Sequence, residues 1–174
     1  MVRSSLMILA AALACTAPVT GQDNPLSSVA KSDYSMVRDF VIRAAEKMPE
    51  ESYGFKPRPE VRSFALLIGH IADDQYAYCL AVKGENRSSD FEKTAPPKPE
   101  TVVALKLAFA HCDASYDVLV DVSAIDNVKF RGREVPRVIV LLLHSGHAWE
   151  HYGNVVVYLR LNGLVPPSNE KAAM

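Results

Sequence analysis

Four long segments of this 174-residue chain carry apolar residues at helical spacing, and prolines, glycines or capping residues bound them. Apolar side chains that recur every three to four residues cover one side of an α-helix. The segments are expected to form helices over residues 32–48, 64–82, 100–122 and 136–162. Such a helix is stable only when its apolar side is buried against other helices. The pattern therefore predicts an all-α protein folded as a four-helix bundle.

The residues between these segments favour turns and loops. Pro49 ends the first predicted helix, Ser63 can cap the second, and Gly163 follows the last. The polar, proline-rich stretch 83–99 is expected to form a surface loop. Residues 127–135 are expected to form a small β-hairpin between the third and fourth helices.

The composition fits one domain and excludes several classes of protein. Hydrophobic residues make up 49% of the chain, which is too many for a disordered protein. The 19 basic and 20 acidic side chains give a formal net charge of −1, whereas nucleic-acid-binding domains usually carry a basic excess. We therefore expect one domain over residues 22–168, no nucleic-acid partner, and a disordered tail over residues 169–174.

Residues 1–21 have the features of a secretory signal peptide. Arg3 precedes an apolar run at residues 6–15, and small residues follow it up to Gly21. The run is shorter than the roughly 20 residues that cross a bilayer, so no transmembrane helix is expected in the mature chain. Cleavage after Gly21 predicts a secreted or periplasmic protein. The alternatives are cleavage before Cys15, which creates a lipoprotein, and a buried helix of the domain.

Two cysteines, Cys79 and Cys112, remain after removal of that segment. An oxidising compartment would allow them to form a disulfide. Buried free thiols are the more common state of cysteines in helices, so the expectation is two free thiols. The chain has no Cys-x-x-Cys pair, which excludes a ribbon-type zinc site.

The last predicted helix carries three histidines on one side. His147 and His151 are four residues apart, so both imidazoles can reach one metal ion at about 2.0–2.1 Å. Buried imidazoles are costly unless each is hydrogen-bonded or bound to a metal. The stripe therefore predicts a metal site, with a set of hydrogen-bonded core histidines as the alternative. The stripe expected to face the interior comprises Val140, His144, His147, His151, Asn154, Tyr158 and Leu161.

His70 on the second predicted helix is the best candidate for a third ligand, and Asp74 follows it by one turn. Three nitrogen ligands leave one coordination position open, as catalytic metal sites require. Water bound there would be acidified and could act as nucleophile or base. Asp74 is the candidate catalytic base. The alternatives for Asp74 are a fourth ligand, a residue that orients a ligand, and a plain surface carboxylate.

Three further residues are expected outside the ligand set. His144 precedes His147 by one turn but lies about 10.5 Å along the helix axis from His151, so it is expected to support the ligands rather than bind the ion. Asn154 follows His151 by one turn. It is expected to orient His151 or bound water, or to pack as a buried amide. His111 is expected to be structural.

The pattern resembles the DinB-like superfamily of metal-binding four-helix bundles. That family places one metal histidine on its second helix and an H-x-x-x-H pair on its fourth. The resemblance covers roughly residues 28–168. The residues that carry it are Arg62-Ser63-Phe64 before His70, the pair His147 and His151, and Tyr158-Leu159-Arg160 followed by Gly163 and Pro166.

The resemblance implies that His70, His147 and His151 bind zinc, or else nickel, iron or manganese. This chain differs from the family's usual pattern at two positions near the ion. Asn154 stands where the family usually has glutamine, and Tyr152 stands where it usually has a basic residue before glycine. Family members of known activity are metal-dependent transferases and isomerases that use low-molecular-weight thiols, and others are classed as hydrolases. Such thiols are chiefly cytosolic, which argues against a thiol for an exported protein.

The signal peptide and the resemblance together predict an exported enzyme in which a divalent ion held by three histidines activates a thiol or water to act on a small-molecule substrate. The alternative is a metal-binding or scaffold bundle without turnover. A homodimer is expected only because DinB-like bundles often dimerise.

Overall fold

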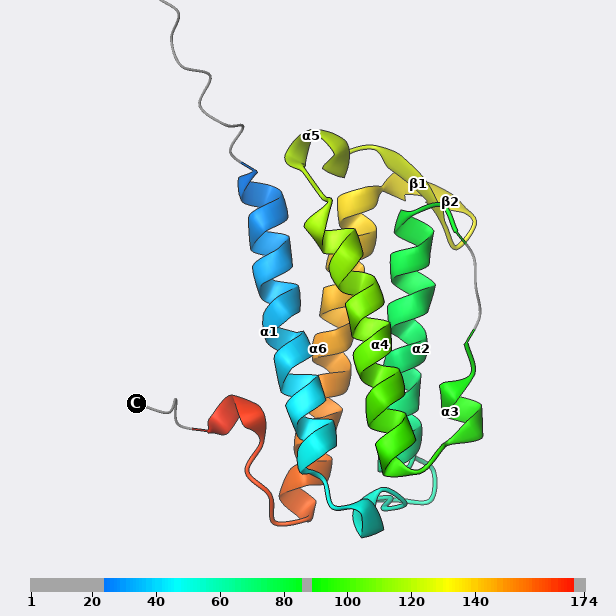
Figure 1. The fold of residues 1–174 in the computed structure, drawn as a ribbon, viewed down its shortest axis with the longest axis vertical. Helices are drawn as coiled ribbons and strands as arrows, with labels where there is room; N and C mark the ends of the chain where they lie inside the picture. Colours follow the sequence, from blue (N-terminus) through cyan, green and yellow to red (C-terminus); the bar gives the residue numbers. More distant parts are fainter. Residues whose placement is uncertain (1–23, 86–88, 171–174) are drawn as a thin grey trace, which may run out of the picture.

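The computed structural model describes residues 24–85 and 89–170 and places them in a four-helix bundle with a β-hairpin at one end (Figure 1). Two one-turn helices, α3 (Phe91–Thr94) and α5 (Asp121–Ala124), lie in the connections. The predicted all-α bundle is confirmed, and the second helix has the predicted bounds. The long helices are α1 (Pro25–Lys47), α2 (Phe64–Val82), α4 (Lys98–Asp117) and α6 (Arg137–Leu161).

Each long helix packs against two others. α1 contacts α6 and α4, and α2 contacts the same two helices from the other side. The chain passes from α1 to α2 through the short turn Glu50–Ser52 and an extended connection. Because α2 and α6 pack together, residues about 70 positions apart in the sequence face each other inside the bundle.

α1 begins at Pro25, earlier than the predicted start near Ser32. Proline is favoured in the first turn of a helix because its missing N–H needs no partner there. The Asp121 carboxylate accepts hydrogen bonds from the backbone N–H groups of Leu26 and Ser27, at 3.1 and 2.8 Å. This cap comes from a distant part of the chain, so Pro25 was the only one of these two signals that the local sequence offered.

The connection between α4 and α6 differs in part from the prediction. The third long helix ends at Asp117, and α5 replaces its predicted last turn. The predicted hairpin is present, with β1 (Asn127–Phe130) antiparallel to β2 (Arg133–Pro136). Its turn residues Arg131 and Gly132 both have positive φ, 48° and 79°, as a two-residue hairpin of right-handed twist requires.

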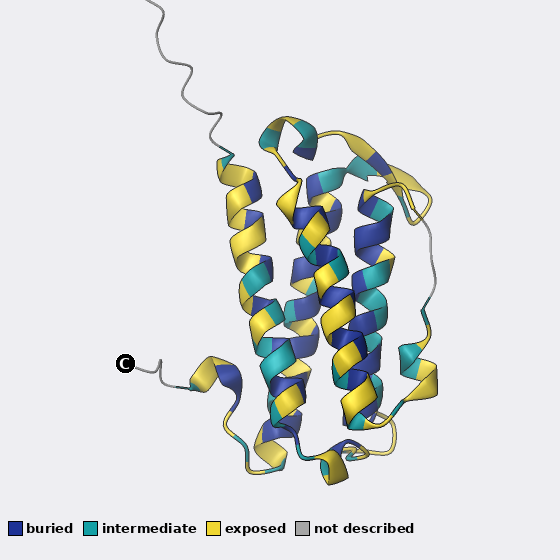
Figure 2. Cartoon of the chain, viewed as in Figure 1, coloured by how far each residue is buried: buried dark blue, intermediate teal, exposed yellow. Residues whose placement is uncertain are grey.

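Buried residues line the inner sides of the long helices, and exposed residues cover the outer sides (Figure 2). Within this core Cys79 of α2 and Cys112 of α4 form a disulfide, with Cα atoms 5.3 Å apart. The expectation of two free thiols is therefore wrong. Helical periodicity places each cysteine in the core, but only the packing of α2 on α4 sets them opposite each other at a distance that a disulfide can span.

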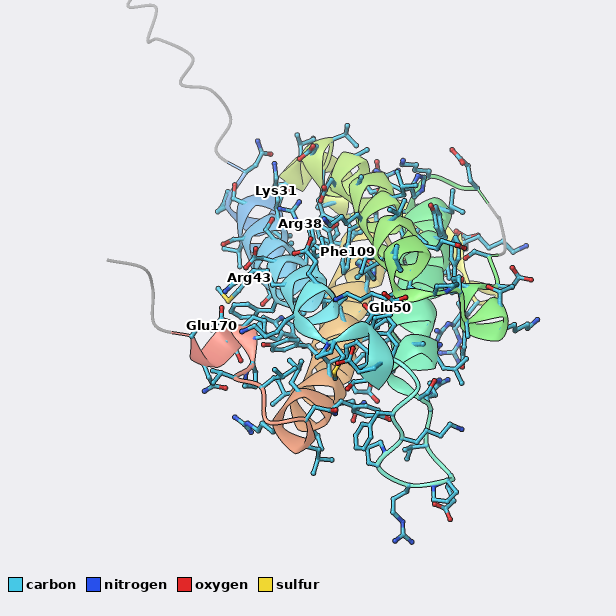
Figure 3. The ribbon with its side chains drawn as sticks, turned by 60° about the horizontal axis from the view of Figure 1, so that its bottom comes forward. Lys31, Arg38, Arg43, Glu50, Phe109 and Glu170 are labelled. Atoms are coloured by element: carbon cyan, nitrogen blue, oxygen red, sulfur yellow. A yellow bond between two sulfur atoms is a disulfide. The ribbon has the colours of Figure 1, made fainter. Side chains whose placement is uncertain are left out.

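The chain after α6 turns back against α1. Residues Pro167–Asn169 form a short 3₁₀ turn, and the Glu170 carboxylate pairs with Arg43 and Lys47 (Figure 3). The predicted disordered tail is therefore wrong for Asn169 and Glu170. The rest of that tail, 171–174, and the predicted signal peptide lie outside the described residues. Among the described helices, none combines the length and apolar character needed to cross a membrane.

Candidate metal centre

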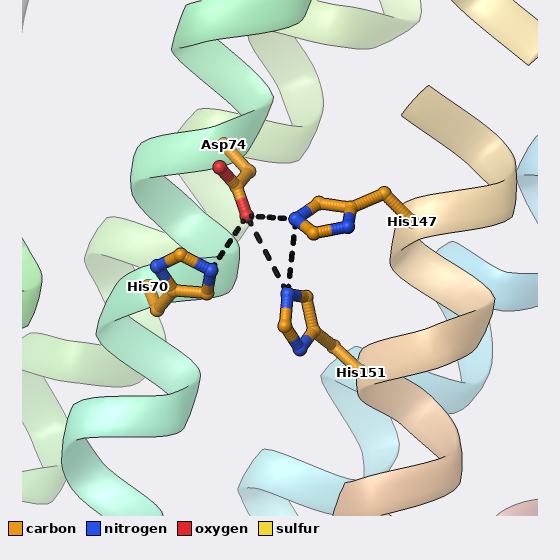
Figure 4. Close-up of side chains that lie close together, drawn as sticks. All are labelled: His70, Asp74, His147 and His151. Carbon is orange, nitrogen blue, oxygen red and sulfur yellow. Dashed lines mark hydrogen bonds and ion pairs between the residues drawn. The ribbon is translucent and has the colours of Figure 1, made fainter. Parts of the chain in front are cut away.

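Four side chains that can bind a metal ion meet between α2 and α6. α2 supplies His70 and Asp74, and α6 supplies His147 and His151, each pair one helical turn apart. Figure 4 shows all four side chains pointing into the space between the two helices. One potential ligand atom of each residue lies within 4.8 Å of those of the others. The structure thus brings the three predicted ligands together with the predicted catalytic residue.

The distances within the cluster centre on Asp74. Its Oδ2 atom lies 3.1 Å from Nε2 of His70, 3.1 Å from Nε2 of His147 and 3.8 Å from Nε2 of His151. The Nε2 atoms of His147 and His151 are 3.0 Å apart. Two ligands of one tetrahedral ion, each at about 2.1 Å, are about 3.4 Å from each other. The four donor atoms therefore have a spacing that fits a single ion.

Hydrogen bonds within the protein leave part of this cluster unsatisfied. Among the described residues, the buried Oδ2 of Asp74 and Nδ1 of His151 have no hydrogen-bond partner of acceptable geometry. His70 faces a carboxylate on both sides, Asp74 at 3.1 Å and Glu92 at 2.8 Å. A neutral imidazole has one N–H, so one of these contacts sets a nitrogen lone pair against an oxygen unless the ring is protonated or another cation lies between the two atoms. A divalent ion among the donor atoms would be such a cation.

Glu92 of α3 orients His70 from outside the cluster. Its Oε2 lies 2.8 Å from Nδ1 of His70, and its Oε1 accepts a hydrogen bond from Nε of Arg62 at 2.7 Å. A carboxylate on the outer nitrogen of a histidine directs the other nitrogen toward a metal. Glu150 makes a longer contact of this kind with Nδ1 of His147, at 3.3 Å. Sequence analysis missed both glutamates, although the three-residue spacing of Glu150 from His147 was a usable signal.

Two residues of α2 hold α3 in place. The Asp73 carboxylate accepts hydrogen bonds from the backbone N–H groups of Phe91 and Glu92, each at 3.0 Å. Gly69 allows the close approach, because a Cβ atom there would lie 2.8 Å from the carbonyl oxygen of Phe91. The position of Glu92 beside His70 therefore depends on backbone contacts that no local pattern in the loop reveals.

Burial has the largest influence on the ionisation of the site. It raises the pKa of Asp74, and the nearby His70 and His147 counteract it in part. Burial, followed by the charges of His147 and His70, lowers the pKa of His151 to about 4. Burial alone would raise the pKa of Glu92, but hydrogen bonds from Arg62 and His70 outweigh it, and this pKa is lowered. At neutral pH His151 is thus in the unprotonated form that binds metals.

His144 lies one turn before the cluster in a separate network. Its Nε2 is 2.7 Å from Oε1 of Gln75, and its Nδ1 is 3.1 Å from the hydroxyl of Tyr116. Burial lowers the pKa of His144 to about 3. The Tyr78 ring packs beside both His144 and His147, with ring centres 5.5 and 5.9 Å away. The expected support of the ligands by His144 is thus limited to contact through Tyr78 in the described structure.

Tyr158 of the predicted stripe on α6 is buried, but two other positions toward the C-terminal end are not. Asn154 and Leu161 are exposed, so the expectation of a buried amide at Asn154 is wrong. Nδ1 of His151 has no hydrogen-bond partner, so Asn154 does not orient this histidine through it. A helix turns by about 100° per residue, which places Asn154 about 80° around the axis from His144. The interior positions are instead continued by Ala148, Val155 and Leu159.

A pocket of about 570 Å³ opens beside the cluster. His151 and Glu92 belong to its wall, Leu67 of α2 and Val157 of α6 add apolar surface, and Asn154 lies at its edge. Its volume is typical of sites that hold small molecules. A small molecule in this pocket would contact a residue of the candidate metal centre.

The fold and this cluster define a four-helix bundle with a candidate metal centre between its second and last long helices. A family model described as the DinB superfamily matches residues 34–155, which is more than half of the chain. The chain belongs to the DinB superfamily. The resemblance seen in the sequence is therefore confirmed. A search of curated proteins finds no match.

Solved structures with the same fold include two DinB-like proteins. The first, from Bacillus cereus, has a TM-score of 0.71 and 15% identity over 80% of this chain and 95% of the other. The second, from Bacillus subtilis, has a TM-score of 0.65 and 22% identity over 83% and 99% of the two chains. A mycothiol-dependent maleylpyruvate isomerase has a TM-score of 0.63 and 16% identity over 74% of this chain and 60% of the isomerase. At these identities the matches establish the fold.

Proposed function

We propose that this protein binds one divalent metal ion through His70, His147 and His151. The observation that carries the proposal is the buried Oδ2 of Asp74, which has no hydrogen bond and lies 3.1–3.8 Å from three imidazole nitrogens. Zinc is the first expectation, because imidazole and carboxylate are among its ordinary ligands. Nickel, iron and manganese are the alternatives.

We further propose that the protein is an exported enzyme of the transferase or hydrolase type. A bound divalent ion lowers the pKa of a water or thiol that it coordinates. In this proposal Asp74 accepts or returns a proton within the cluster, where its Oδ2 lies 3.1–3.8 Å from three imidazole nitrogens. The pocket beside His151 gives a small molecule access. The shared fold with a mycothiol-dependent isomerase supports a thiol as one candidate reactant.

The alternative is a metal-binding bundle without turnover. It has its own support, because Oδ2 of Asp74 belongs to the donor set and could complete four protein ligands. A four-ligand site of this kind is closed and structural, whereas three ligands leave a position for a reactant. The role of Asp74 therefore separates the two functions.

Replacement of zinc by Co(II) tests both proposals, because the absorption spectrum of Co(II) reports its coordination number. Stoichiometric Co(II) in the parent, lost in His151→Ala, is expected. Asp74→Asn should keep the metal and remove activity if Asp74 is a base. Loss of the metal in Asp74→Asn, with no change in the parent spectrum on addition of small thiols, would favour the alternative. Absence of metal from the parent protein would contradict the binding proposal itself.

Export and self-association remain predictions. The charged start and apolar run at residues 1–21 support a signal peptide, so mass spectrometry of the native protein should find a first residue near Gln22 or a lipid on Cys15. A cytosolic protein that retains Met1 would contradict export. The homodimer rests on the family alone, and light scattering that gives the mass of one chain would contradict it.

A further inference from the structure

The pocket beside His151 has one guanidinium among its wall residues, that of Arg62. Arg62 ends the extended connection before α2, and its backbone carbonyl accepts a hydrogen bond from the Tyr158 hydroxyl at 2.6 Å. Its Nε donates to Glu92, which fixes the plane of the guanidinium. Within the described structure the two terminal amino groups of Arg62 donate no hydrogen bond. They are available to a ligand in the pocket.

The carboxylates of the wall already have partners. Glu92 is held by Arg62 and His70, and Glu60 lies exposed at 3.8 Å from Arg58. A divalent ion would add two positive charges to a cluster that contributes one negative charge through Asp74. The ion and Arg62 would together carry three positive charges against the two negative charges of Asp74 and Glu92, and the exposed Glu60 is offset by Arg58. The loaded pocket would therefore keep one net positive charge, which favours a negatively charged group there.

The remaining wall is apolar on both sides. Leu67 of α2 faces the pocket together with Val157 of α6 and Pro57 and Val61 of the connection before α2. Such a wall favours burial of a short hydrocarbon portion of a ligand. A ligand that matches the pocket combines an apolar body with an acidic end.

We propose that this pocket binds a small organic carboxylate, with the carboxylate on the terminal amino groups of Arg62 and the apolar body between Leu67 and Val157. The planar guanidinium fork suits a carboxylate because it can donate two parallel hydrogen bonds. This proposal rests on the proposed function, because it assigns the substrate class of the same site.

Two probes of equal shape test the proposal: hexanoate, which carries a carboxylate, and hexanamide, which does not. Both are titrated into the zinc-loaded protein while the backbone amide resonances of Leu67 and Val157 are followed by NMR. Hexanoate should shift both resonances and bind at least tenfold more tightly than hexanamide. Equal affinities in the parent protein would overturn the proposal.

Three variants locate the charge that is recognised. Arg62→Met should bring the affinity for hexanoate down to that for hexanamide, and Arg62→Lys should restore only part of the preference. Arg133→Met is the matched control, because Arg133 is exposed on β2 and lies outside the pocket wall. A full preference in Arg62→Met would overturn the proposal by assigning the carboxylate to the metal. If Arg62→Met does not fold, a full preference in Arg62→Lys would do the same.

Failure of carboxylate binding can be distinguished from failure of metal binding. Zinc content is measured on the same samples before each titration. A parent protein without zinc contradicts the metal proposal, yet the comparison of hexanoate with hexanamide still reports on Arg62. A zinc-loaded parent that binds both probes equally keeps the metal proposal and rejects the carboxylate.

Discussion

Two histidine environments lie one turn apart on α6 and differ in how their polar atoms are satisfied. Both ring nitrogens of His144 have hydrogen-bond partners in Gln75 and Tyr116, and its side chain is 1% exposed. In the cluster of His147 and His151, buried polar atoms lack partners, and three nitrogens crowd one carboxylate oxygen. His151 is buried like His144, whereas His147 is partly exposed, so for the two buried histidines the unsatisfied atoms are what distinguish a candidate ligand from a structural histidine.

The largest expected difference between the two environments is in what is lost when a histidine is removed: the metal in one case, stability in the other. His147→Ala or His151→Ala should abolish stoichiometric metal, because two of three nitrogen ligands do not hold a divalent ion in competition with water. His144→Ala should keep the metal but lower the free energy of unfolding by about 3 kcal/mol, because it leaves a cavity and unpaired partners. Metal analysis and urea unfolding of the same samples measure both effects.

His111→Ala is the control for the loss of a histidine from a bundle helix and should keep the metal. A His144→Ala protein without metal, alongside a His151→Ala protein that retains it, would reverse the assignment of the two environments.

Removal of the metal by a chelator should also distinguish the two environments, through a smaller change in stability. A ligand that binds only the folded state adds about 2.7 kcal/mol at 100-fold excess over its Kd, or roughly 5–10 °C in the Tm of a domain of this size. Removal of the metal should therefore lower the Tm of the parent and of His144→Ala equally. The Tm of His151→Ala should not respond to a chelator. An unchanged Tm in a parent protein shown to have contained metal would count against a stabilising ion.

The part of this structure that the sequence predicts is the part set by local chemistry. Ser63 caps α2 as expected, since its hydroxyl accepts from the N–H of Leu66 at 3.3 Å. The i,i+4 spacing of His147 and His151 likewise defines half of the cluster. Interactions between distant segments could not be predicted from local patterns. The Asp121 cap of α1, the pairing of Cys79 with Cys112, and Glu92 on His70 all depend on how the helices pack.

Lowering the pH should reduce the free energy of unfolding, because His144 is buried in its neutral form. Its pKa is about 3 in the folded chain, against about 6.5 when unfolded. Below pH 6.5 the unfolded chain therefore binds a proton that the folded chain does not, and stability falls as the pH falls toward 3. From neutral pH to pH 5 this amounts to about 2 kcal/mol at 1.36 kcal/mol per pH unit.

The measurement is urea unfolding of the metal-free protein from pH 7 to pH 5. His144→Gln, which keeps a polar side chain without a titrating ring, should lose less stability than the parent over this range. Parallel curves for the two proteins would show that His144 takes up its proton equally in both states.

The smallest expected effect concerns Glu92, which contacts the outer nitrogen of His70. His144 has no carboxylate partner of this kind among the described residues. Glu92→Gln should weaken metal binding by about tenfold, because an amide orients His70 less firmly than a carboxylate.

Gly69→Ala should also weaken metal binding, although Gly69 does not contact the ion. Its Cβ would lie 2.8 Å from the Phe91 carbonyl oxygen and displace α3, which carries Glu92. Alanine normally stabilises a helix relative to glycine, so a loss of metal affinity in Gly69→Ala would come from displaced α3 rather than from α2 itself. Gly146→Ala is the matched control, because a Cβ there meets nothing within 4 Å. If α3 acts only by placing Glu92, the double variant Gly69→Ala/Glu92→Gln should bind the metal no more weakly than either single variant. Losses that multiply would instead show that α3 and Glu92 act on the site independently.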